Sequence, residues 1–124
     1  MAAKLNPRAF DMARTLVTEG RLVTDDRDQW SEHQPSAAAE NAFIREHGFD
    51  EYALWHLGMD TDQPRDTKKR YKFPYGDFER IHRCAVLAAE SRAAQRRHAD
   101  IQSAAAHLHG MLDALLMTES RAAS

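Results

Sequence analysis

Large apolar side chains are scarce in this chain, and that scarcity limits the folds open to it. Leu, Ile, Val and Phe supply 21 of the 124 residues, and alanine alone supplies another 21. Only three Val and three Ile are present, which is too few for the many strands of a β-sandwich or barrel. Because the formal net charge is only −2, the composition does not indicate disorder. We therefore predict an all-α fold, a small bundle of four to five helices that forms a single domain over residues 1–124.

Capping residues place the helices of the first half. Asn6 is a cap candidate, Pro7 suits a first helical turn, and Gly20 suits a helix end. A second helix is predicted over residues 36–47, and a short third helix over residues 50–57. Residues 59–76 show no clear periodicity, so we expect a long irregular loop with at most a brief extended segment at 71–73.

The C-terminal part has a strong helical pattern. Asp77 is the cap candidate, and an apolar stripe with helical spacing follows it. A second stripe begins at Ile101 and is out of phase with the first, which favours a helical hairpin with a break near residues 98–100 over one long helix. Residues 118–124 are expected to form a frayed tail.

One short motif has the spacing of a metal site. Glu79 and His82 are three residues apart and would lie together on a helix, where both could bind one ion. No second Glu-x-x-His step occurs in the chain, so the alternative is a surface pair. Cys84 follows His82 at a spacing that faces away on a helix, which predicts a packed side chain and not a reactive thiol. The sequence requires no cofactor.

Basic and aromatic residues are concentrated in the middle of the chain. Residues 63–84 carry seven basic and three acidic side chains, whereas residues 1–62 carry six and twelve. The run at 65–72 offers candidate anion-binding residues: Lys68, Lys69, Arg70 and Lys72. A nucleic-acid-binding domain usually has a stronger basic excess than this slightly acidic chain, so nucleic acid is not favoured as a partner.

Seven of the ten aromatic residues lie between positions 49 and 78. They could attach the long loop to the core, or they could line a small-molecule pocket. The pocket hypothesis rests on Trp55, His56, Tyr75 and Arg80. We favour the first interpretation, in which titratable side chains do not gather into a site.

The end of the last helix predicts self-association. Gly110 suggests a close helix approach, and an apolar group follows it: Leu112, Leu115, Leu116 and Met117. That is more apolar surface than a small monomer covers easily, so we expect a homodimer. A single cysteine, no apolar run of membrane-spanning length and no apolar leader predict a cytoplasmic protein, with no membrane partner. The excess of Arg over Lys and the abundant Ala are typical of GC-rich bacterial genes.

Three functional hypotheses follow. The first is a non-enzymatic interaction module that uses the loop 59–76 to bind a protein partner. The second is a small-ligand or metal-binding enzyme with a site near His56, Glu79 and His82. The third is a polyanion-binding protein that uses the basic segment 65–72.

Overall fold

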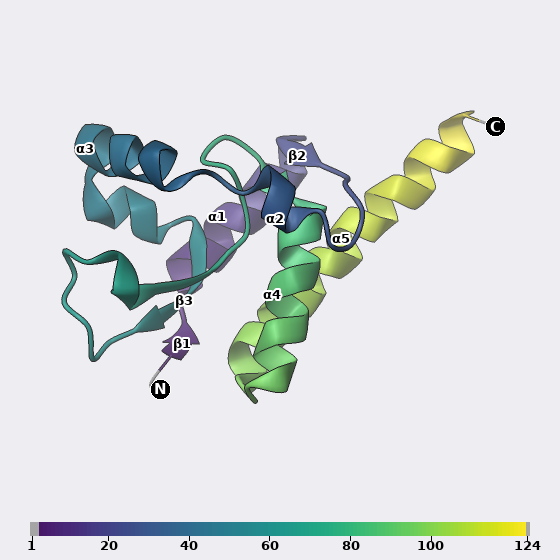
Figure 1. Cartoon of the computed structure of the whole chain (residues 1–124). Coiled ribbons are helices and arrows are strands. Elements are labelled where there is room, and N and C mark those ends of the chain that lie inside the picture. Colours follow the sequence, from purple (N-terminus) through teal and green to yellow (C-terminus); the bar gives the residue numbers. More distant parts are fainter. Residues whose placement is uncertain (1–2, 124) are drawn as a thin grey trace.

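The computed structural model describes the backbone of residues 3–123 and the side chains of residues 3–118, and it shows a mixed α/β fold (Figure 1). The prediction of an all-α bundle is therefore wrong, because the described residues include five short strands in two sheets. The elements follow one another as β1 (Ala3–Leu5), α1 (Pro7–Thr18), β2 (Leu22–Val23), α2 (Trp30–His33), α3 (Ala37–Ala53), β3 (His56–Asp60), η1 (Lys68–Arg70), β4 (Tyr71–Pro74), β5 (Ile81–His82), α4 (Arg83–Gln95) and α5 (Ala99–Ala123).

The larger sheet is antiparallel and has β3 at its centre. Strand β1 pairs with one edge of β3 and β4 pairs with the other. The sequence His56–Asp60 shows no alternation of polar and apolar residues because nearly every position on this central strand is buried. The predicted helix over 50–57 is thus wrong after Ala53, and the predicted irregular loop over 59–76 is wrong at residues 59–60, which belong to β3. The extended segment predicted at 71–73 is confirmed as β4.

The smaller sheet consists of β2 and β5, which run parallel. Asp77 does not start a helix. Its Oδ1 accepts the backbone N–H groups of Glu79 and Arg80 and so stabilises a tight turn that leads into β5. Helix α4 begins only at Arg83, with His82 in the N-cap position, five residues later than predicted.

Helices α4 and α5 form the predicted hairpin and lie side by side in Figure 1. The break falls at residues 96–98, where Arg97 has a φ of 60°, so a residue in the left-handed region takes the role that glycine usually plays. Helix α5 continues to Ala123 and projects beyond the rest of the molecule (Figure 1). No helix within the described residues is long and apolar enough to span a membrane.

Small side chains fill much of the core, as the composition indicates. Alanines of α1, α4 and α5 are completely or almost completely buried, and their size allows the helices to approach closely. The aromatic rings of the middle segment complete the interior, as predicted for rings that attach this segment to the core. The buried alanines and rings are Ala9, Ala13, Ala85, Ala89, Ala93, Ala104, Ala105, Tyr52, Trp55, Tyr71, Phe73 and Tyr75.

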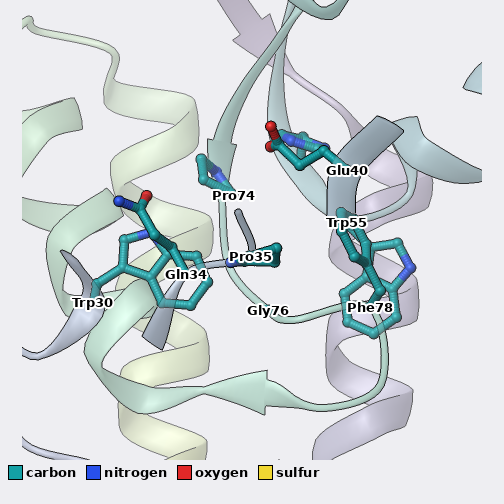
Figure 2. A pocket seen from close by; sticks show the side chains of 9 residues that line it. Trp30, Gln34, Pro35, Glu40, Trp55, Pro74, Gly76 and Phe78 are labelled. Atoms are coloured by element: carbon teal, nitrogen blue, oxygen red, sulfur yellow. The ribbon is translucent and has the colours of Figure 1, made fainter. Parts of the chain in front are cut away.

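Two glycines differ sharply in their surroundings. A Cβ atom at Gly76 would lie 2.5 Å from the carbonyl oxygen of Arg80 and 2.7 Å from the ring of Trp55 (Figure 2), so the turn before β5 requires glycine. A Cβ atom at Gly110 would meet nothing within 4 Å. The prediction that Gly110 marks a close helix approach is therefore wrong within the described chain.

We expect opposite effects when each glycine is replaced by alanine. Gly76→Ala should lower the free energy of unfolding by about 2 kcal/mol because the new methyl group collides with backbone and ring atoms. Gly110→Ala should raise it by about 0.5–1 kcal/mol because alanine favours the exposed interior of a helix. Urea unfolding of both variants measures the two values, and equal effects would contradict the assignment of the turn.

Candidate functional site

The two parallel strands bring together residues that are far apart in sequence. Leu22 pairs with Ile81 and Val23 pairs with His82, and both strands end at the same edge of the small sheet. Asp25 follows β2 by two residues, and Cys84 follows β5 by two residues. The register therefore places the Asp25 side chain beside the start of α4, where Cys84 lies.

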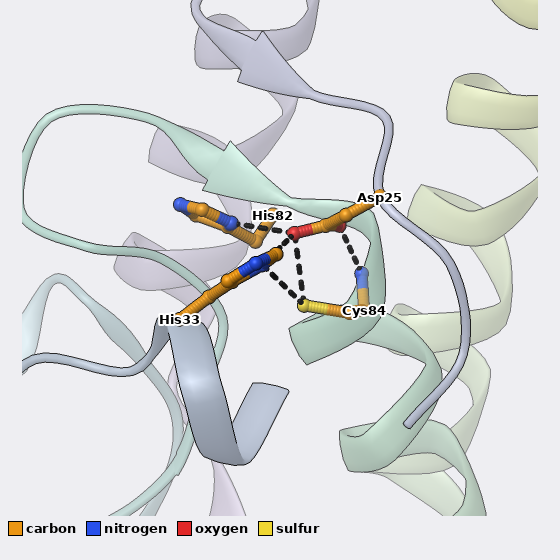
Figure 3. Close-up of side chains that lie close together, drawn as sticks. All are labelled: Asp25, His33, His82 and Cys84. Carbon is orange, nitrogen blue, oxygen red and sulfur yellow. Dashed lines mark hydrogen bonds and ion pairs between the residues drawn. The ribbon is translucent and has the colours of Figure 1, made fainter. Parts of the chain in front are cut away.

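One oxygen of Asp25 is the meeting point of three side chains (Figure 3). The Nδ1 atoms of His33 and His82 each lie 2.8 Å from Asp25 Oδ2. The Sγ atom of Cys84 donates to the same oxygen at 3.0 Å. His33 belongs to α2, His82 to β5 and Cys84 to α4, so the cluster joins three elements to the loop after β2.

The second oxygen of Asp25 caps a helix. Asp25 Oδ1 accepts the backbone N–H of Cys84 at 2.7 Å, in the first turn of α4. His82, the residue in the N-cap position, makes no side-chain cap bond, so Asp25 supplies this interaction from another part of the chain. Burial by itself would raise the pKa of Asp25, but the hydrogen bonds from Cys84, His82 and His33 outweigh it and lower the pKa to about 2.

The thiol of Cys84 is not poised as a nucleophile in this arrangement. Burial raises its pKa to about 12, and the hydrogen bond to the Asp25 carboxylate adds to the effect. A cysteine nucleophile needs the opposite, a lowered pKa and a base that accepts its proton. His33 Nδ1 lies 3.9 Å from the sulfur, but the thiol donates its hydrogen bond to the Asp25 carboxylate. The negative charge of that carboxylate disfavours the thiolate.

His82 is held at both ring nitrogens. Its Nδ1 faces Asp25, and its Nε2 lies 2.9 Å from Oδ2 of Asp77. Burial by itself would raise the pKa of Asp77, but hydrogen bonds from His82 and from two backbone amides lower it. A carboxylate on the far nitrogen fixes the ring orientation and the tautomer of a metal-binding histidine, so Asp77 has the position of a supporting residue.

The four side chains have the donor types and spacing of a metal site. One ligand atom from each of Asp25, His33, His82 and Cys84 lies within 4.8 Å of all the others. Tetrahedral zinc, with bonds of about 2.0–2.3 Å, places its ligand atoms roughly 3.3–3.8 Å apart. The contacts to Asp25 Oδ2, at 2.8–3.0 Å, would therefore lengthen by less than about 1 Å, and any wider separations would shorten, to place all four atoms around one ion.

The structure separates the two residues of the predicted metal pair. His82 belongs to the cluster, but Glu79 is exposed and lies in the turn before β5, where helical spacing does not apply. Asp25, His33 and Cys84 gather around His82, a convergence of titratable side chains that we did not expect from the sequence. His82 and Cys84 face the same carboxylate because the chain changes there from strand to helix.

The residues of the predicted pocket do not surround a common ligand space. Trp55 and His56 line a small cavity with Phe78 and Glu40 (Figure 2), which has room for little more than a water molecule. Tyr75 is fully buried, and its hydroxyl donates to the carbonyl of Leu54 at 2.8 Å.

Arg80 is exposed, and the basic residues of segment 65–72 have different neighbours. Lys68 pairs with Glu40 at 3.3 Å, and Lys69 is exposed. Arg70 donates to the carbonyl of Gln63 at 2.9 Å. Lys72 lies apart from them on β4, near arginines of α4.

Comparisons with protein-family models, with curated proteins and with solved structures give no match to this chain. The assignment of a site therefore depends on the geometry alone.

Stability should depend on pH through His56, which is almost completely buried. Burial lowers its pKa from 6.5 to about 4, whereas the unfolded chain retains the ordinary value. Between pH 6.5 and 4 the unfolded chain binds the additional proton, so the folded state loses about 3 kcal/mol of stability as the pH falls through this range. Unfolding of the wild type and of His56→Gln in chelator at pH 7 and pH 4 measures the difference.

The matched control is His47→Gln, which replaces an exposed histidine. We expect it to retain the pH dependence of the wild type, while His56→Gln loses most of it. A His56→Gln protein with the pH dependence of the wild type would contradict the assignment.

Proposed function

We propose that this protein binds a zinc ion through Asp25, His33, His82 and Cys84. The observation that carries the proposal is the convergence of one sulfur and two imidazole nitrogens on a single carboxylate oxygen. Sulfur, imidazole and carboxylate are the three ligand types that zinc takes in proteins. The carboxylate of Asp77 on the far nitrogen of His82 supports the same interpretation.

The charges of the cluster favour a divalent transition metal. Cys84 bound to a metal is a thiolate, and with the Asp25 carboxylate it gives two negative charges, which balance one divalent cation. A buried site of zero net charge avoids the large cost of an isolated buried ion. Magnesium and calcium prefer oxygen ligands throughout, so a set with one sulfur and two nitrogens disfavours both.

Four ligands from one chain fill a tetrahedral coordination sphere, which is the pattern of a structural zinc site. The ion would join the segment that carries Asp25 and His33 to the start of α4. Only His33 is appreciably exposed, with 35% of its side chain accessible. The free energy of metal binding would therefore stabilise the attachment of α2, a helix of four residues.

Metal analysis of the purified protein tests the proposal. We expect one zinc ion per chain, and cobalt added to the metal-free protein should give the absorption spectrum of a tetrahedral site with a sulfur-to-cobalt band. Cys84→Ser should abolish that band. His33→Ala should weaken binding at least tenfold while the band persists at high cobalt, because three ligands remain.

His47→Ala is the control, since His47 is an exposed histidine outside the cluster. It should bind cobalt like the wild type. The proposal would be contradicted if the protein bound neither zinc nor cobalt. It would also be contradicted if Cys84→Ser left the cobalt spectrum unchanged.

Self-association stays a prediction. The helix end that led to it projects from the molecule (Figure 1), and Met117 has 62% of its surface exposed. Leu112, in contrast, is fully buried within the chain and cannot contribute to a dimer contact. A cytoplasmic location also stays a prediction.

A further inference from the structure

A row of adjoining depressions follows the seam between β4 and α4, on residues that the zinc proposal does not use. The first depression, beside Lys72, and the second, beside the alanines of α4, share Phe73 and Arg92 as wall residues. The second and third share Trp30, Gln34 and Pro74. Because neighbouring depressions have walls in common, we treat them as one groove, which we name the seam groove.

One end of the seam groove is cationic. Lys72 of β4 and Arg92 and Arg96 of α4 line it together with Ala3 and Phe73. None of the described residues that line this end carries a carboxylate, and none of the described acidic groups forms an ion pair with its three cations. The negative end of the α4 dipole favours the two arginines but does not account for Lys72, which belongs to a strand.

The middle of the seam groove is apolar. Phe73 and Pro74 form one wall, and three alanines of α4 form the other. Small side chains at these helix positions leave the space open, because a larger residue at Ala88 would extend into it. The cationic and apolar parts have volumes of about 50 Å³ and about 90 Å³, which is below the size range of enclosed small-ligand pockets, so a ligand would lie along an open surface groove.

The far end of the seam groove is narrow. Trp30, Gln34 and Pro35 of the segment around α2 lie opposite Trp55 and leave space for little more than a water molecule (Figure 2). A ligand would thus place its charged group among the cations and its apolar part along the alanines, ending near Trp30.

We infer that the seam groove binds a small amphiphile, an apolar chain or ring that carries one anionic group. Carboxylates and phosphate monoesters share the required chemistry, because either accepts charge-assisted hydrogen bonds from arginine and lysine. The apolar part would cover Phe73 and the alanines of α4. The inference is independent of the zinc site, since none of the four zinc ligands lines the groove.

Calorimetric titration with octyl phosphate and octanoate, below the concentrations at which they form micelles, tests the inference. We expect saturable binding of one molecule per chain for at least one of the two, and the stronger one identifies the preferred head group. Octanol lacks the charge, and inorganic phosphate lacks the chain, so each should bind at least tenfold more weakly.

Variants on both parts of the groove sharpen the test. Arg92→Gln and Arg96→Gln remove exposed cations and should each reduce affinity about tenfold. Ala88→Phe fills the apolar part from an exposed helix position and should abolish binding. Lys69→Gln removes an exposed cation outside the groove and should bind like the wild type.

Three results would overturn the inference. One is the absence of binding by both charged probes. Another is equal affinity for octanol or for inorganic phosphate, which would show that only one part of the groove matters. The third is an equal loss of affinity in Lys69→Gln and Arg92→Gln, which would indicate attraction by net charge alone.

Discussion

The buried carboxylate of Asp25 links parts of the chain that are up to 59 residues apart in sequence. Only 4% of this side chain is exposed to solvent, so its charge must be compensated by protein groups. Two histidines, a thiol and a backbone amide provide that compensation. The loop after β2, the short helix α2, strand β5 and the start of α4 are all positioned by this one group.

The thin core explains why such a polar contact matters. A chain with few large apolar residues gains less free energy from burial, and alanine contributes little per residue. Close packing of α4 on α5 and the rings of the middle segment supply most of the apolar contacts. Helix α2 has no buried residue of its own, so its position depends on His33 and on the contacts of Trp30 with its neighbours.

Local signals in the sequence located several helix ends correctly. The predicted start of a helix at residue 36 is confirmed, because Ser36 caps α3 through a hydrogen bond from the amide of Ala39, and the phase shift between two apolar stripes indicated the break between α4 and α5. Strand β3 escaped notice because a strand buried on both faces lacks alternation, and its first two residues fitted the end of the predicted helix over 50–57.

The candidate site was hidden for a related reason. Its residues come from four segments that only the parallel pairing of β2 with β5 brings together, and two-residue strands have no sequence signature. His82 was singled out, but with the wrong partner, since the helix that would place Glu79 beside it does not begin until Arg83. The assumption of a helix also removed Cys84 from consideration, although the two side chains share the Asp25 carboxylate.

The central claim is that one zinc ion takes its ligands from Asp25, His33, His82 and Cys84. X-ray absorption at the zinc edge of the metal-loaded protein tests it most directly, because the method counts sulfur neighbours separately from nitrogen and oxygen. We predict one sulfur at about 2.3 Å and three lighter atoms at about 2.0–2.2 Å. A coordination shell without sulfur would contradict the account.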